Sequence, residues 1–194
     1  MTDISSVTPY HVPASQAGPR KTALDLLAQA ARQQAAHEWE QAIELLTRAW
    51  DAAQASGAER VAFEREILDR RAECRRLQGD LPGAATDLEA LARLAAEQGD
   101  PAAQVAADLR RARALVRLGE PVRARALAEE TLEMARRLGE QRLEAHSLLQ
   151  IGGALRRLGQ FAESERYCAL ACELAHLLGD EACEAHPLSF SGVA

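Results

Sequence analysis

The sequence has few aromatic side chains and no long apolar run. Aromatic residues make up 4% of the 194 residues, whereas apolar residues as a whole reach 47%, mostly Ala and Leu. This balance favours closely packed helices over sheets. No segment approaches the roughly 20 apolar residues that cross a bilayer, and the amino terminus lacks a basic start followed by an apolar stretch. We therefore expect a soluble, cytoplasmic protein with no membrane partner.

Lysine and cysteine are also scarce. Lys21 is the single lysine among 23 basic residues, so arginine carries nearly all the positive charge, and the net charge is −6. Because nucleic-acid-binding proteins carry an excess of positive charge, we expect no nucleic-acid partner. The cysteines are too few and too unevenly spaced for a disulfide framework, and we expect reduced thiols at Cys74, Cys168, Cys172 and Cys183.

Sequence signals of catalysis are absent. The chain has no phosphate-binding loop, no Gly-x-Ser-x-Gly elbow and no dinucleotide-binding fingerprint. His37-Glu38 is not followed by a second histidine at the spacing of zinc proteases. We predict a protein that is not an enzyme and needs no cofactor.

The sequence does contain a repeat of about 40 residues. Its clearest copy is residues 148–171, and the repeat is marked by glycines that can take the left-handed conformation closing a helix, at Gly79, Gly99, Gly119, Gly139, Gly159 and Gly179. The spacing predicts pairs of helices over about 21–36 and 39–55, 60–78 and 81–98, 101–118 and 121–138, and 141–158 and 160–178. Asp80 and Asp100 are expected to cap helices, with Pro82 and Pro101 in the first turns.

These pairs define the predicted domain organisation. We expect a disordered tail over residues 1–19, which are rich in Ser and Pro, and a helical repeat domain over residues 20–194. Its units are 20–57, 58–99, 100–139 and 140–179, followed by a partial fifth unit over 180–194. That remnant repeats the Glu-Ala-His of residues 144–146 at residues 184–186, and it is either the start of a further unit or a terminal cap.

Small residues recur where paired helices approach each other closely. They occupy the middle of each first helix and two points of most second helices: Ala30, Ala72, Ala112 and Gly152, then Ala42, Ala84, Ala124, Ser164, Ala49, Thr131 and Ala171. This pattern resembles the tetratricopeptide repeat (TPR), and its longer period is similar to the repeats of Pins, kinesin light chains and Rap- or MalT-type regulators. The resemblance implies an all-α, right-handed α-solenoid of four helix pairs plus a partial fifth first helix. HEAT-type repeats are the weaker alternative, because their Pro, Asp and Arg landmarks do not recur.

In the TPR family the first helices line a concave groove that binds partners. Transferred to this chain, the groove-facing positions are Leu24, Leu27 and Ala31; Glu66, Asp69, Arg70, Glu73 and Arg76; Leu109, Arg110, Arg113, Val116 and Arg117; and His146, Leu149, Gln150, Gly153, Arg156 and Arg157. Since guanidinium groups bind carboxylates through paired hydrogen bonds, the hypothesis is an acidic or mixed-charge peptide partner, with Leu109, Val116 and Leu149 in apolar contact. The alternative is a solvated surface with ordinary intrahelical pairs such as Glu66–Arg70.

The predicted function is a non-catalytic protein–protein interaction scaffold or regulatory module. The alternative is a ligand- or peptide-sensing domain of a larger bacterial signalling protein.

Candidate zinc ligands occur near the carboxyl-terminal end of the sequence. Cys168, Cys172 and His176 share a helical stripe, followed by Cys183 and His186, and such ligands can hold zinc. In the other units, however, the cysteine positions carry apolar residues, for example Leu46 and Leu88 in place of Cys168. We therefore interpret the cysteines as buried apolar residues and predict no metal site.

Overall fold

A computed structural model of the chain describes residues 18–179. Over these residues the chain forms eight α-helices and one short 3-10 helix. Their bounds are α1 Pro19–Ala35, α2 Trp39–Ala53, η1 Gly57–Glu59, α3 Arg60–Gln78, α4 Leu81–Glu97, α5 Pro101–Arg117, α6 Pro121–Leu138, α7 Gln141–Arg157 and α8 Phe161–Leu178. The four predicted helix pairs are confirmed. The predicted partial fifth unit and nearly all of the predicted tail lie outside the described residues.

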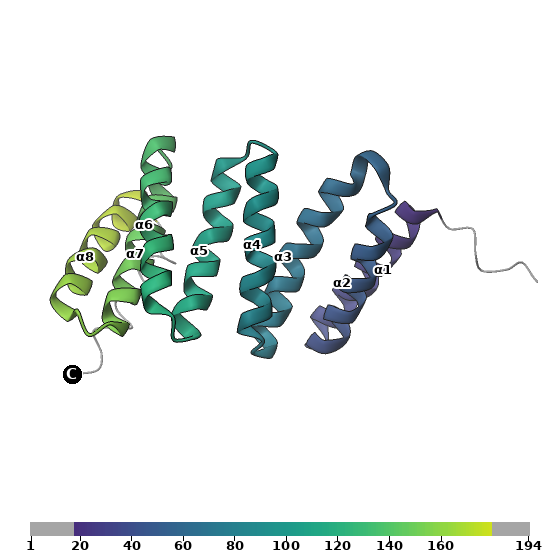
Figure 1. The fold of residues 1–194 in the computed structure, drawn as a ribbon, viewed down its shortest axis with the longest axis horizontal. Coiled ribbons are helices and arrows are strands. Elements are labelled where there is room, and N and C mark those ends of the chain that lie inside the picture. The colour runs from purple at the N-terminus through teal and green to yellow at the C-terminus, as the bar shows by residue number, and fades with distance from the viewer. Residues whose placement is uncertain (1–17, 180–194) are drawn as a thin grey trace, which may run out of the picture.

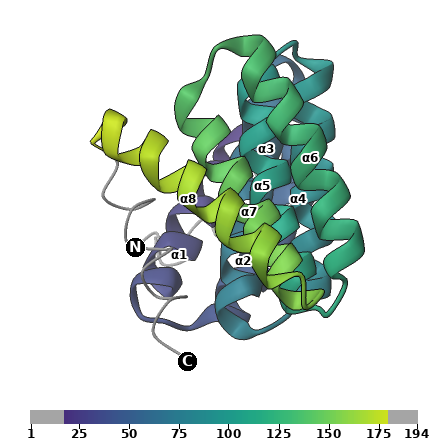
Figure 2. The same cartoon turned by 90° about the vertical axis from the view of Figure 1, so that its left-hand side faces the viewer.

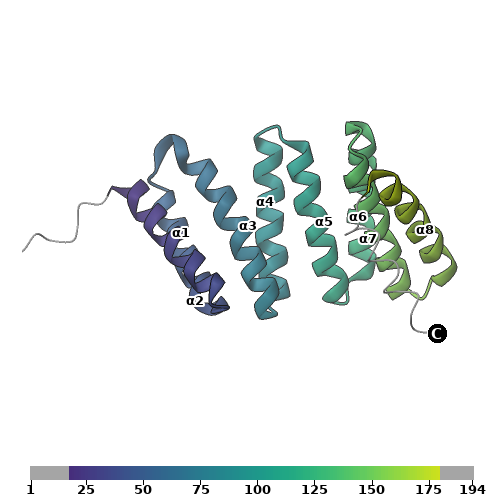
Figure 3. The same cartoon turned by 180° about the vertical axis from the view of Figure 1, so that it is seen from behind.

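The helices stand side by side in a row, and each packs against the next one in the chain (Figure 1). Even-numbered helices form one layer, and the odd-numbered helices form the other, seen from behind in Figure 3. Figure 2 looks along the row from the α8 end. Helix α1 also contacts α3, and α5 contacts α7, so helices of the odd-numbered layer pack against one another within their layer. The predicted all-α repeat solenoid is confirmed.

The turns between helices use the left-handed conformation that the glycine spacing predicted. Within the pairs, φ is 96° at Gly79, 80° at Gly119 and 76° at Gly159. The first pair has His37 at this place, and its φ is 59°, so the turn keeps its geometry without the glycine. A left-handed residue with a side chain costs roughly 1–2 kcal/mol. His37 also packs edge-on against Trp39, with ring centroids 5.2 Å apart.

Both predicted caps are confirmed. The Asp80 carboxylate accepts a hydrogen bond of 2.9 Å from the backbone N–H of Gly83, and the Asp100 carboxylate accepts one of 3.0 Å from Ala103. Each bond satisfies one of the backbone donors left open at a helix start.

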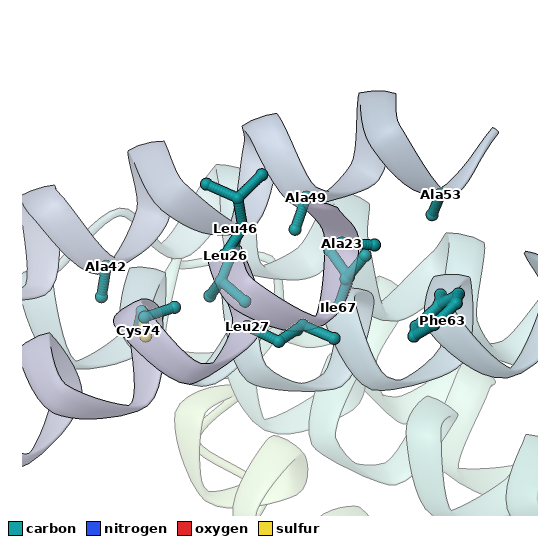
Figure 4. Packing of buried hydrophobic residues seen from close by; sticks show 11 residues of the cluster. Ala23, Leu26, Leu27, Ala42, Leu46, Ala49, Ala53, Phe63, Ile67 and Cys74 are labelled. Carbon is teal, nitrogen blue, oxygen red and sulfur yellow. The ribbon is translucent and has the colours of Figure 1, made fainter. Parts of the chain in front are cut away.

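The core runs the length of the row between the two layers. The predicted close-approach residues Ala30, Ala72 and Ala112 are buried. At the first pair, the α1, α2 and α3 side chains meet in one cluster that contains Leu26, Leu46 and Ile67 among others (Figure 4). Each helix pair therefore buries its apolar surface against its neighbours, as repeat arrays do.

Two sets of apolar residues on α1 fit a helical period. Leu24, Leu27, Ala28 and Ala31 form one set, but the buried face of α1 consists of Ala23, Leu26, Leu27 and Ala30. Both sets fit a helical period and share Leu27, so periodicity alone could not separate them. Leu24 is 47% exposed because α1 turns the other set between α2 and α3.

A buried ionic cluster joins α3 to α4. Asp87 is 2% exposed, and its carboxylate forms ion pairs with Arg71 at 2.7 Å and with Arg75 at 2.8 Å. The Arg71 guanidinium also lies over the Trp50 ring, 5.8 Å from its centroid, which brings in α2. Arg71 and Arg75 of α3 therefore hold α3 to α4 through a buried carboxylate.

Candidate functional site

A series of cavities follows the odd-numbered layer. One of about 500 Å³ lies between α3 and α5. Two more, of about 310 Å³ and 400 Å³, lie further along α5, the first toward α3 and the second toward α7. The largest, about 690 Å³, lies among α5, α7 and the start of α8. Together they form a groove whose walls carry most of the residues predicted for it.

In the α3 part of the groove the charges pair with one another. Glu66 accepts from Arg70 at 3.0 Å, which confirms the expected intrahelical pair. Asp69 pairs with Arg110 across the gap from α3 to α5. Glu73 accepts from Arg76 at 2.8 Å, and this hydrogen bond lowers the pKa of the Glu73 carboxyl. This part of the groove therefore presents charges of both signs that are already bonded to each other.

Arg70 is engaged more deeply than the sequence indicated. Its Nη2 donates to the carbonyl oxygen of Leu27 at 3.1 Å and to Gln34 Oε1 at 2.6 Å. Gln34 in turn donates from Nε2 to the Sγ of Cys74 at 3.0 Å, and burial raises the pKa of that thiol. The side chains of Arg70, Gln34 and Cys74 thus link α1 to α3.

The cavity of about 690 Å³, the largest of these four, has the opposite character, and we call it the arginine cavity. Four arginines line it, and no acidic side chain does: Arg113, Arg117, Arg156 and Arg157. Within residues 18–179, Arg113, Arg117 and Arg157 form no salt bridge. Desolvation in the groove lowers the pKa of Arg113, and the like charges of Arg76 and Arg110 lower it further. Positive charge is therefore concentrated here, and the Glu73 carboxylate offsets part of it at Arg113.

The apolar lining of the groove differs from the predicted one. Leu109 is 6% exposed and Leu149 is 3% exposed, so both pack mainly in the core and only reach the cavity floors, whereas Val116 is half-buried. Sequence reasoning missed Phe161, which lines the arginine cavity and is 62% exposed. Phe161 belongs to a second helix, and only first helices were expected in the groove. The sequence did contain a signal for Phe161: a large apolar residue also begins two other second helices, at Trp39 and Leu81.

The predicted residues of α7 divide between two cavities. His146 and Gln150 line the 400 Å³ cavity together with Arg110 and Arg113. Gln150 and Gly153 also line the arginine cavity. Of the two adjacent glycines of α7, Gly152 lies at a close helix approach, whereas a Cβ on Gly153 would have no neighbour within 4 Å.

Among residues 18–179, no three His, Cys, Asp or Glu side chains are arranged to hold a metal ion. Cys168 is half-buried and burial raises the pKa of its thiol, while Cys183 and His186 lie outside the described residues. None of helices α1–α8 is long and apolar enough to cross a bilayer.

Comparison with solved structures identifies the fold as that of TPR-like repeat proteins. The chain is similar to RapI in its apo form, with a TM-score of 0.75 and 15% identity over 83% of this chain and 45% of RapI. It is similar to the TPR-like repeats of a Podosopora anserina protein described as a kinesin light chain, with a TM-score of 0.70 and 16% identity over 86% of this chain and 80% of the other. It is also similar to BtubC (BKLC) from P. vanneervenii, with a TM-score of 0.55 and 16% identity over 91% of this chain and 85% of the other.

The predicted resemblance to TPR proteins is thereby confirmed at the level of fold. No protein-family model and no curated protein sequence matches the chain. At 15–16% identity the solved structures define the repeat architecture, and the chain spans less than half the length of RapI. Function must be argued from the groove itself.

Proposed function

We propose that the protein is a non-catalytic interaction module whose groove binds an acidic or mixed-charge peptide segment of a partner protein. The observation that carries the proposal is the arginine cavity, where Arg113, Arg117 and Arg157 form no salt bridge within the described residues. Guanidinium groups bind carboxylates through two parallel hydrogen bonds, so an acidic segment supplies what the cavity lacks.

The connection between the cavities supports an extended ligand. Arg113 lines the arginine cavity and both smaller cavities along α5, and Arg110 lines the 500 Å³ cavity and the same two. The four cavities therefore follow one another along the groove. A peptide strand can occupy such a path, with its acidic residues at the α5–α7 end and residues of either charge beside the paired charges of α3.

Charge reversal at the cavity tests this function. In the double variant Arg113→Glu/Arg117→Glu, we expect the affinity for fluorescein-labelled acidic peptide libraries to fall at least about tenfold in fluorescence anisotropy, because two attractive charges become repulsive. The matched control is Arg93→Glu/Arg166→Glu, which changes the net charge equally at exposed positions that do not line the cavity. Equal weakening by both variants would mean that only overall charge matters, and the groove would be ruled out as the site.

A further inference from the structure

The arginine cavity carries more positive charge than one carboxylate can neutralise. Arg113 and Arg117 are four residues apart on α5 and so lie on the same helix face, while Arg156 and Arg157 come from the end of α7. The nearby Glu73 carboxylate is hydrogen-bonded to Arg76 and forms no salt bridge with Arg113. Two helices thus present guanidinium groups to one space.

A phosphate monoester fits this arrangement better than a carboxylate does. It carries a charge of about −1.5 to −2 near neutral pH and three terminal oxygens, so it can accept from several arginines at once. A carboxylate carries a single charge on two oxygens, and one guanidinium satisfies it through a paired contact. Because three of the arginines form no salt bridge within residues 18–179, a dianion neutralises more of the positive charge in the cavity than a single carboxylate does.

Resting on the proposed function, we propose that the arginine cavity binds a phosphorylated side chain carried by an extended peptide segment. The volume of about 690 Å³ far exceeds that of a phosphate group and leaves room for neighbouring peptide residues. Phe161 and Val116 give those residues apolar contact, and Gly153 leaves the α7 backbone uncovered beside them.

The shape of the groove favours a peptide as the source of the phosphate. The arginine cavity shares Arg113 with the 310 Å³ and 400 Å³ cavities, and shares Gln150 with the latter. The binding surface therefore continues past the phosphate position toward α3. A free phosphate or a small phosphorylated molecule would leave these cavities empty.

Peptide libraries with a fixed central residue test the proposal. The purified full chain is titrated into three fluorescein-labelled libraries whose central residue is phosphoserine, Glu or Ser, at about 0.15 M salt and near neutral pH. We expect the phosphoserine library to bind at least about tenfold more tightly than the Glu library, because charge and oxygen count both rise. The variant Arg113→Gln/Arg157→Gln should abolish this preference, whereas Arg93→Gln/Arg166→Gln should retain it. Circular dichroism verifies that each variant is folded.

The possible outcomes distinguish failure of the phosphate inference from failure of the proposed acidic-peptide function. Equal binding of the phosphoserine and Glu libraries, with both weakened in Arg113→Gln/Arg157→Gln, would overturn the phosphate inference and leave the acidic-peptide function standing. Failure of every library to bind would overturn both. Inorganic phosphate or free phosphoserine is expected to compete only at concentrations at least about a hundredfold higher than the peptide. Competition at equal concentrations would identify a small-anion site and overturn the peptide source.

Discussion

At the scale of single residues, two adjacent glycines of α7 lie in opposite environments. A Cβ on Gly152 would lie 2.6 Å from the Sγ of Cys168 and 3.3 Å from the carbonyl oxygen of Ser164. The Ser164 hydroxyl also donates to the carbonyl oxygen of Gly152 at 2.8 Å, so α7 and α8 touch here. Gly153 faces the arginine cavity and has space for a methyl group.

Alanine substitutions should therefore have effects of opposite sign. Gly152→Ala should lower the free energy of unfolding by about 1–3 kcal/mol, since α8 must move away from α7. Gly153→Ala should raise it by about 0.4–1 kcal/mol, because the substitution restricts the unfolded chain without a clash. Urea denaturation of both variants measures the two changes, and effects of the same sign would contradict the packing described for this helix pair.

At the scale of helices, the junction of α4, α5 and α6 places one arginine among three carboxylates. Arg111 is 2.8 Å from the Glu89 carboxylate and 3.9 Å from that of Asp108, and Glu130 adds a third negative charge. The pKa of Asp108 is raised to about 6, mainly by burial; Arg111 lowers this pKa, while Glu130 and Glu89 add to the increase. The junction thus holds a carboxyl group that titrates in a mildly acidic range.

The raised pKa predicts how stability depends on pH. The ordinary value for Asp108 is 3.8, so between about pH 4 and 6 the folded chain holds a proton that the unfolded chain has lost. Stability from this group therefore falls as pH rises through that range, and the full cost is present above it. Asp108→Asn stays neutral, so it should gain about 1–3 kcal/mol of stability near pH 7 and little near pH 4.

Urea denaturation of the wild type and of Asp108→Asn across this pH range provides the measurement. A gain that is equally large at both ends would indicate better packing and would refute the titration of Asp108. The pair of curves is informative because Arg111 keeps its 2.8 Å partner, Glu89, in the variant.

At the scale of the whole molecule, each helix pair is held mainly by its neighbours, so stability varies along the array. Arg70→Ala removes the bonds from α3 to Leu27 and Gln34 of α1, and we expect α1 and α2 to open more often. Hydrogen exchange measured by mass spectrometry should be faster there by roughly tenfold, corresponding to the loss of one or two hydrogen bonds, and unchanged in α7 and α8. Arg48→Ala, on an exposed face of α2, serves as the matched control. Acceleration spread evenly over all the helices would instead show that the array opens as one unit.

The sequence predicted the array far better than it predicted the groove, for physical reasons. Turn glycines, the Asp80 cap and small residues such as Ala72 act over one or two helical turns, so their spacing alone specifies the helix pairs. The pairing of Asp69 with Arg110 depends on how α3 and α5 are aligned, which no local pattern encodes. For the same reason, the sequence predicted which charged residues lie on the first helices, but it did not predict which of them form ion pairs with each other.

Trp50, whose ring lies beneath the Arg71 guanidinium, contributes to the intrinsic fluorescence of the protein. The chain has two tryptophans, Trp39 and Trp50, and both belong to α2. Indole emission therefore follows the first helix pair, whereas far-ultraviolet circular dichroism averages over every helix. If the pairs melt at different denaturant concentrations, the two signals will give different midpoints, and a ligand held at Arg157 will leave the emission spectrum unaltered. An added tryptophan at Phe161 would give the other end of the array its own fluorescent reporter.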